Sequence, residues 1–244
     1  MEKEWFESWF DSPYYKLLYQ HRDEIEAASF IKKLLKEIHL EKGSKILDIP
    51  CGNGRHSLVM AELGYDVIGI DLSERNIFEA LLNEIPNLHF FEHDMRAPLF
   101  KNQFDLAMNL FTSFGYFDSE EENNKVMQSI SQSLKPGGIL VIDFFNKMKL
   151  VKNLKSTDRI KAGEVDFIIE RKIENNFVNK SIHIKDGLKE FDFEECVQLL
   201  ELKDFEKFYT PFGLITEKVF GDYELNVFDE NSERLIILAK KQND

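Results

Sequence analysis

Short apolar runs alternate with amphipathic segments through the first 146 residues of the chain. Five runs have the length and composition of buried strands: SKILDI, YDVIGIDLS, NLHFFEHD, FDLAMNLF and GGILVIDFFN. The segments around them carry apolar residues at helical spacing, which predicts helices over residues 24–40, 55–63, 74–85 and 119–134. Strands that alternate with helices in this way predict right-handed crossovers and a parallel sheet.

The pattern changes after the fifth run. Three stretches of alternating polar and apolar residues follow, and they meet at Asn175-Asn176 and at Asp186-Gly187. An Asp-Gly pair between alternating segments is a strong signal for a two-residue hairpin turn. We therefore predict a small antiparallel β insertion over residues 163–199.

The earlier pattern of helices and strands resumes behind the insertion. A helix is expected over residues 202–209, a strand over 214–220 and a final strand over 234–241, which is antiparallel and at or near the edge of the sheet. The whole chain, 1–244, then forms one α/β domain. Its predicted fold class is a Rossmann-like, doubly wound, mostly parallel seven-stranded sheet with the small antiparallel insertion.

The first strand runs into a helix through the segment ILDIPCGNGRHS, residues 46–57. Gly52 and Gly54 let a ligand approach the backbone, because a Cβ at either position would hold it away. The turn leaves helical N–H groups at the carboxyl end of the sheet, where open α/β sheets bind ligands. The segment indicates a small-molecule site; an ordinary tight turn is the simpler alternative.

Three carboxylates end three successive predicted strands: Asp48, Asp71 and Asp94. Asp71 comes seventeen residues after Gly54, near the roughly 20 expected for a carboxylate that holds ribose hydroxyls. Asp94 is placed to accept a hydrogen bond from an adenine amino group. Because Asp48 would repel a phosphate, the set favours a cationic nucleoside. S-adenosylmethionine, with a sulfonium, an ammonium and no phosphate, fits it.

Residues 52–57, GNGRHS, also allow a dinucleotide-binding interpretation, with Ser57 at the third small position. Asp48 and the step LKPGG before the fifth strand are features that a dehydrogenase does not need. An NAD-dependent dehydrogenase is therefore kept as a remote alternative.

Charge and cysteine content narrow the partners and the compartment. Lys and Arg number 31 against 44 Asp and Glu, and this net charge of −13 disfavours a nucleic-acid substrate, which needs a basic face. Cys51 and Cys196 have no metal-ligand spacing, so neither disulfides nor a metal site are expected. No run is long and apolar enough for a membrane span or a secretory signal, so we expect a cytoplasmic protein without membrane contact.

Five motifs in order resemble those of class I S-adenosylmethionine-dependent methyltransferases: ILDIPCGNGRHS, VIGIDLS, FFEHDMR, FDLAMNLFTSFGYF and LKPGGILVIDFFN. The resemblance covers residues 44–146, with a weaker echo over 220–241. Pro50 stands where the family usually has the first glycine of the loop, which removes one backbone N–H there. The resemblance implies a methyltransferase-type sheet and S-adenosylmethionine as the cofactor.

The resemblance also implies which residues hold the methionine, ribose and adenine portions: Asp48, Gly52, Gly54, Asp71, Leu72, Asp94 and Met95. It implies further that Asn109, at the end of the fourth strand, lines the sulfonium side of the cofactor. Among these, Asp71 would bind the ribose and Asp94 would face the adenine, with Met95 donating a backbone N–H to the ring. Cys51 joins them as a small packing side chain of the loop rather than as a nucleophile.

Residues 1–42 precede the first strand and are rich in aromatic side chains. In relatives a leading helix covers the site, so this segment is expected to form a helical lid. Tyr19 and Arg22 would then reach the methionine carboxylate, Arg22 by a bidentate contact; a surface pair of Arg22 with Glu26 is the alternative. The insertion over 163–199 is expected to cover the substrate or to form a dimer.

Enzymes that methylate exocyclic amines of adenine or glutamine carry an Asn/Asp-Pro-Pro-aromatic motif after the fourth strand, and this chain lacks it there. It also lacks the Pro-Cys motif that cytosine C5 methyltransferases carry at the same place. We therefore expect methyl transfer to an N or O nucleophile of an unidentified small molecule. In-line positioning can supply much of the rate, so no catalytic residue is assigned. The candidate bases are Tyr14, Tyr15, Tyr19, Tyr116 and His183, although a hydrophobic lid and a solvated strand explain them more simply. A protein side-chain methyltransferase and a non-catalytic S-adenosylmethionine-binding protein are the alternatives.

Overall fold

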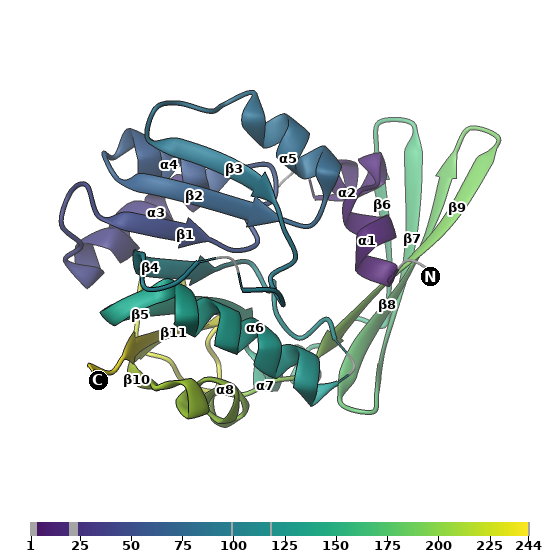
Figure 1. Cartoon of the computed structure of the whole chain (residues 1–244). Helices are drawn as coiled ribbons and strands as arrows, with labels where there is room; N and C mark the ends of the chain where they lie inside the picture. Colours follow the sequence, from purple (N-terminus) through teal and green to yellow (C-terminus); the bar gives the residue numbers. More distant parts are fainter. Residues whose placement is uncertain (1–3, 20–23, 99, 118, 244) are drawn as a thin grey trace.

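A seven-stranded sheet forms the centre of the molecule, in the order β10-β11-β5-β4-β1-β2-β3 (Figure 1). The structure is a computed structural model that describes residues 4–19, 24–98, 100–117 and 119–243. The strands of this sheet are β1 (Lys45–Asp48), β2 (Asp66–Asp71), β3 (Leu88–Glu92), β4 (Phe104–Asn109), β5 (Leu134–Phe145), β10 (Leu214–Phe220) and β11 (Arg234–Lys241). Strands β1 to β5 pair in parallel, whereas β11 is antiparallel to β5 and β10. The predicted Rossmann-like sheet is confirmed, and β11 lies one strand in from the edge.

Helices cover both faces of this sheet. One face is packed by α3 (Glu24–Ile38), α4 (Arg55–Glu62) and α5 (Glu74–Leu81), the other by α6 (Glu120–Ser133) and α8 (Leu202–Tyr209). Successive strand residues go to opposite layers: Ile46 packs with the first group and Leu47 with the second. Both faces are therefore buried, which is why the strands read as continuous apolar runs. Two short helices, α7 (Lys147–Lys152) and the 3-10 turn η1 (Thr210–Phe212), complete this part.

The insertion is a separate antiparallel sheet of β6 (Thr157–Ala162), β7 (Val165–Glu174), β8 (Phe177–Asp186) and β9 (Lys189–Gln198). The sequence predicted three strands over 163–199, and this was wrong by one strand, because β6 starts earlier. As an edge strand β6 buries only Ala162 fully, so its sequence TDRIKA shows little of the apolar alternation that marks the other three.

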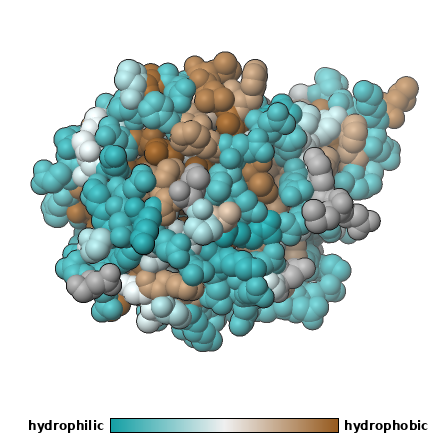
Figure 2. Space-filling view, in the orientation of Figure 1, coloured by the Kyte–Doolittle hydropathy of each residue, from teal (hydrophilic) through white to brown (hydrophobic). Residues whose placement is uncertain are grey.

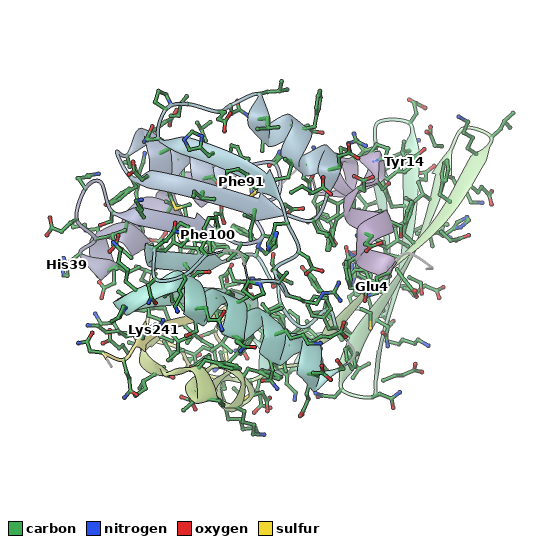
Figure 3. All side chains as sticks on the ribbon, viewed as in Figure 1. Glu4, Tyr14, His39, Phe91, Phe100 and Lys241 are labelled. Atoms are coloured by element: carbon green, nitrogen blue, oxygen red, sulfur yellow. The ribbon has the colours of Figure 1, made fainter. Side chains whose placement is uncertain are left out.

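Two N-terminal helices, α1 (Trp5–Phe10) and α2 (Pro13–Leu18), lie between the two sheets (Figure 1). Trp9 and Leu18 are buried against Phe167 and Ile182 of the insertion sheet. Tyr14, labelled on α2 in Figure 3, donates a hydrogen bond of 2.9 Å to Asp186 Oδ2 at the end of β8. The N-terminal segment thereby fastens the insertion to the main sheet.

The face of the molecule drawn in Figure 2 is mostly polar. Figure 2 shows apolar side chains gathered at the top of one face, over α5, where Phe78 and Leu82 are exposed. No helix formed by the described residues is both long enough and apolar enough to cross a bilayer.

Candidate active site

A cavity of about 880 Å³ opens at the carboxyl ends of β1, β2 and β4. The strand order reverses between β1 and β4, and open α/β sheets bind ligands at such a reversal. The three carboxylates that the sequence singled out, Asp48, Asp71 and Asp94, all line this cavity. Its volume suits a nucleoside-sized molecule.

The loop after β1 exposes its backbone to the cavity at Gly52. This residue has a φ of +56°, and a Cβ built on it would meet nothing within 4 Å, so it would project into open space. Gly54 differs: its φ is +79°, but a Cβ there would lie 2.5 Å from the ring of Phe90. Gly54 also does not line the cavity. It serves the packing of α4 on β3, whereas Gly52 leaves room for a ligand.

Asp71 ends β2 and is buried, with 8% of its surface exposed. Its Oδ2 accepts a hydrogen bond from the N–H of Gly52 and its Oδ1 one from the N–H of Ser73, each at 2.9 Å. Burial raises the pKa of this carboxyl, and the backbone hydrogen bonds oppose the rise. The Asn76 side-chain amide also donates to Oδ1, at 3.5 Å, so Oδ2, with the Gly52 bond, is the less occupied oxygen toward the cavity.

Asp48 ends β1 and is 2% exposed. The Ser57 hydroxyl donates to its Oδ2 at 2.6 Å. Burial raises the pKa of Asp48 to about 7, the Ser57 hydrogen bond lowers it, and the nearby charge of Asp71 raises it further. A cation in the cavity would favour the ionised form of this carboxyl.

Asp94 is held by an arginine to which the sequence analysis gave no role. Arg96 donates through Nε and Nη2 to the Asp94 carboxylate at 2.8–3.1 Å, and it also pairs with Glu4 and Glu122. Burial would raise the pKa of Asp94, but these bonds outweigh it and lower the pKa. Because Glu4 precedes α1 (labelled in Figure 3), Arg96 ties the N-terminal segment to the loop after β3. The motif FFEHDMR contains this arginine, and its position two residues after Asp94 was the available signal.

The other predicted site residues separate into three groups. Cys51, Leu72, Met95 and Tyr19 line the cavity. Asn109 does not line it: the side chain is fully buried and its Nδ2 donates to the carbonyls of Ile49 and Ser113, at 2.8 and 3.2 Å. Arg22 lies outside the described residues.

A turn that the sequence analysis missed follows β4. Phe111 and Thr112 both have positive φ, +57° and +64°, which is rare for such residues. Buried Asp143 holds the turn, since its Oδ2 accepts from the Phe111 N–H at 2.9 Å. Arg234 pairs with the other oxygen at 2.7 Å. A lone aspartate inside the apolar run LVIDFF was the signal for this buried pair.

His56 is also part of the cavity wall. Its ring stacks on Phe111 with 4.7 Å between centroids, and no described group hydrogen-bonds its Nε2. Burial lowers the pKa of His56 to about 3, so the ring is neutral.

A second cavity of about 610 Å³ adjoins the first and reaches the insertion sheet. The two share a boundary of six residues: Phe10, Tyr15, Tyr19, Arg55, Phe111 and Tyr116. Three candidate bases, Tyr15, Tyr19 and Tyr116, thus lie where the cavities meet. Tyr14 and His183 line neither, and His183 Nδ1 lies 2.8 Å from Asp192 Oδ1 on the next strand.

The described residues contain no group of three or more His, Cys, Asp or Glu side chains that could hold a metal ion.

Comparison with known proteins identifies the family to which this architecture belongs. The profile of a family described as "Methyltransferase domain" matches residues 40–204. The dTDP-3-amino-3,4,6-trideoxy-alpha-D-glucopyranose N,N-dimethyltransferase of Streptomyces venezuelae is 25% identical over 217 residues, which cover 85% of this chain and 91% of that one. The glycine/sarcosine N-methyltransferase of Aphanothece halophytica is 25% identical over 239 residues, or 93% and 86% of the two chains.

Solved structures show the same fold. A S-adenosylmethionine-dependent methyltransferase from Clostridium acetobutylicum superposes with a TM-score of 0.79 at 24% identity, over 94% of this chain and 96% of that one. The dehydrogenase alternative finds no support in these comparisons. With the family match over most of its length, the chain belongs to the class I S-adenosylmethionine-dependent methyltransferases, and S-adenosylmethionine is its cofactor.

Proposed function

We propose that this methyltransferase transfers the methyl group to an N or O nucleophile of a small molecule. The observation that carries the proposal is the pair of adjoining cavities, one lined by the strand-end carboxylates and one closed by the insertion sheet. Two of the three similar proteins named above are N-methyltransferases, of an amino sugar and of glycine or sarcosine, which supports a small amine as acceptor.

The first cavity is proposed to hold the cofactor. Asp71 would accept from the ribose hydroxyls, and Asp94 would accept from the adenine amino group beside Leu72 and Met95. Gly52 supports this fit, because its open Cβ position leaves space for the methionine portion. Asp48 supports it as well, since a cation in the cavity would stabilise the ionised form of this buried carboxyl.

Three further residues of the expected site are proposed to support the cofactor-binding residues indirectly. Cys51 packs in the loop wall, Gly54 permits the close packing that places the loop, and Asn109 braces the turns after β1 and β4. Tyr19, at the boundary of the cavities, is proposed to face the methionine end.

When bound, S-adenosylmethionine supplies a methyl carbon activated by its sulfonium. The chain's contribution is to align the acceptor, exclude water with its aromatic boundary and receive or relay the acceptor's proton. The hydroxyls of Tyr15, Tyr19 and Tyr116 are the groups at that boundary. Which of them takes a proton depends on the acceptor.

We propose that residues 1–42 act as a lid and that the insertion covers the acceptor. The support is that α1 is tied to the loop after β3 through Glu4 and Arg96, and to β9 through Trp9 and Glu195. A dimer through the outer face of the insertion is the alternative, which light scattering distinguishes. The net charge of −13 supports a substrate other than nucleic acid, and two free thiols support a reducing, cytoplasmic location.

The test has two steps. The first is calorimetric titration of the protein with S-adenosylhomocysteine, with NAD in parallel; we expect micromolar binding of the former alone. The second is transfer of labelled methyl from S-adenosylmethionine to panels of small amines, alcohols and carboxylic acids and to a protein extract. Binding without transfer to any panel would favour a non-catalytic binding protein, and transfer confined to the extract would favour a protein substrate.

A further inference from the structure

Three charged residues lie beside one another across the insertion sheet: Arg171 on β7, Lys180 on β8 and Glu195 on β9. In the strand register, Arg171 lies opposite Lys180, and Lys180 lies opposite Glu195. Each lies two residues from an inward-facing apolar residue of its strand, namely Ile169, Ile182 and Phe193, so all three are on the inner face. All three line the second cavity.

The three charges have different partners. Glu195 accepts from Trp9 Nε1 and Tyr19 Oη, both at 2.7 Å, and from Lys180 Nζ at 3.0 Å. Lys180 and Glu195 are only 12% and 16% exposed, so they form a largely shielded ion pair. We call Arg171, Lys180 and Glu195 the charged row. The ion pair of Lys180 and Glu195 connects this row to the N-terminal helices, and its two charges cancel.

Arg171 is the member whose charge is not balanced within the row. Its Nη1 donates a hydrogen bond of 3.3 Å to the carbonyl of Lys155, and no carboxylate of the described residues lies within 4.0 Å of its guanidinium nitrogens. Asp158, on the neighbouring strand β6, pairs with Lys155 at 2.8 Å, and the nearby charge of Arg171 also helps to lower the pKa of Asp158, so this carboxylate offsets part of the charge of both residues from outside the row. The guanidinium therefore retains donors in a partly buried position.

The whole second cavity has the opposite charge balance to the chain. Its described lining contains five cationic side chains, from Arg55, Lys155, Arg171, Lys180 and Arg234, against the single carboxylate of Glu195. Asp143, which does not itself line the cavity, balances the charge of Arg234. Even with Asp143 and Asp158 counted, the cations outnumber the acids around this cavity, in a chain of net charge −13.

We propose that Arg171, assisted by Lys155, binds an anionic group of the methyl acceptor, a carboxylate or a phosphate; this inference rests on the proposed function. A guanidinium presents parallel N–H donors that match the two oxygens of either group. Arg171 and Lys155 line only the second cavity, whereas six other residues line both cavities and mark their boundary. The anion is therefore held away from the cofactor, while the acceptor's nucleophile lies toward the shared boundary.

The aromatic wall of the cavity strengthens this binding. Trp5, Phe145 and Tyr223 line it together with the cations. Apolar rings lower the local dielectric, and a charge pair is stronger there than at an open surface. An acceptor with a charged end and an apolar or sugar-like body would match both kinds of lining.

The experiment uses the full chain saturated with S-adenosylhomocysteine, titrated calorimetrically at constant ionic strength with pyrophosphate and, separately, with malonate. We expect one-site binding of at least one of them, and the stronger of the two identifies phosphate or carboxylate. Arg171→Gln should weaken it at least tenfold, and Arg171→Lys less. The matched control is Lys172→Gln, which removes a charge from the outer face of the same strand, where Lys172 is 62% exposed.

The outcomes separate the two proposals. If S-adenosylhomocysteine itself does not bind, the proposed function fails. If it binds with unchanged affinity to every variant, the fold is intact, and the anion result decides the inference. Absence of anion binding to the wild type, or equal binding by the Arg171→Gln and Lys172→Gln variants, would overturn it.

Discussion

The backbone N–H of Gly52 donates a hydrogen bond of 2.9 Å to the carboxylate of Asp71. This bond joins the loop after β1 to the end of β2, so the residue proposed to hold the ribose also shapes the loop proposed to hold the methionine portion. The second oxygen of Asp71 accepts from the Ser73 N–H. Both oxygens are therefore acceptors, and an amide would set an NH₂ group against a backbone N–H.

Asp71→Ala is expected to weaken S-adenosylhomocysteine binding by about 1–3 kcal/mol, or roughly five- to 150-fold, because a charged acceptor is lost. Asp71→Asn should do no better, for the reason just given. Calorimetric titration measures both. Asp66→Ala, at the exposed start of the same strand, is the control and should bind normally. Unchanged affinity in a folded Asp71→Ala protein would rule out the ribose role.

Gly52→Ala should abolish or strongly weaken cofactor binding while costing only modest stability. An alanine in this left-handed backbone conformation destabilises the fold by about 1 kcal/mol, and its methyl group occupies the space left for the ligand. Gly43→Ala is the matched control, since Gly43 has a φ of +79° and open space around it, but lies outside the cavity. Equal cofactor affinity in the two variants would contradict the proposed position of the ligand.

Asp48→Asn is expected to stabilise the protein without cofactor at pH 8. The folded-state pKa of Asp48, about 7, lies above its ordinary value of 3.8. Such a group favours folding at low pH, and this contribution is lost as the pH rises through 7. The gain for the variant should be about 4 kcal/mol at pH 8, since the two pKa values differ by about three units and each unit is worth 1.36 kcal/mol, and it should vanish near pH 4. Urea unfolding at the two pH values measures it; a destabilised variant at pH 8 would refute the pKa.

Binding of S-adenosylmethionine should depend on pH through the same carboxyl. A cation binds the ionised form, so wild-type affinity should rise about tenfold from pH 6 to pH 8 and then level off. The Asp48→Asn variant should show weaker affinity with a flat profile. An equally steep profile in the variant would assign the titration to another group.

Trp9→Phe should loosen the N-terminal segment, because it removes the Nε1 donor to Glu195 and keeps most of the ring. We expect a loss of about 1.5–3 kcal/mol in the free energy of unfolding, as for a buried hydrogen bond to a charged group. Trp5→Phe is the control, since no described acceptor lies within hydrogen-bond distance of its Nε1. Faster proteolysis within residues 1–42 of the Trp9 variant alone would support the lid role.

Arg234→Met should cost about 3–5 kcal/mol of stability, because it leaves the buried Asp143 carboxylate without its cation. The double substitution Arg234→Met with Asp143→Leu should recover part of this loss. It should remain slow in methyl transfer, since the Phe111–Thr112 turn has lost its acceptor. Denaturant unfolding and a transfer assay separate the two effects. A double variant no more stable than the single one would show that the charge pair is not the cause.

The sequence by itself determined the order of the seven strands of the main sheet and placed Asp48 and Asp71 at strand ends and Asp94 just beyond one, since β3 ends at Glu92. Hydrophobic periodicity is local, and crossover handedness is general, so Asp48, Asp71 and Asp94 were predictably brought to one edge of the sheet. The same reasoning found α8 at Leu202–Tyr209 and β10 at Leu214–Phe220 with their observed bounds.

The tertiary structure alone decided the contacts between residues far apart in the chain. Gly54 is needed because Phe90 lies beside it, and the turn at Phe111 is held by Asp143 and, through it, Arg234. The row of Arg171, Lys180 and Glu195 likewise depends on strand register. A sequence pattern records which face a side chain occupies but not which distant side chain meets it, because register and packing are set by the whole fold.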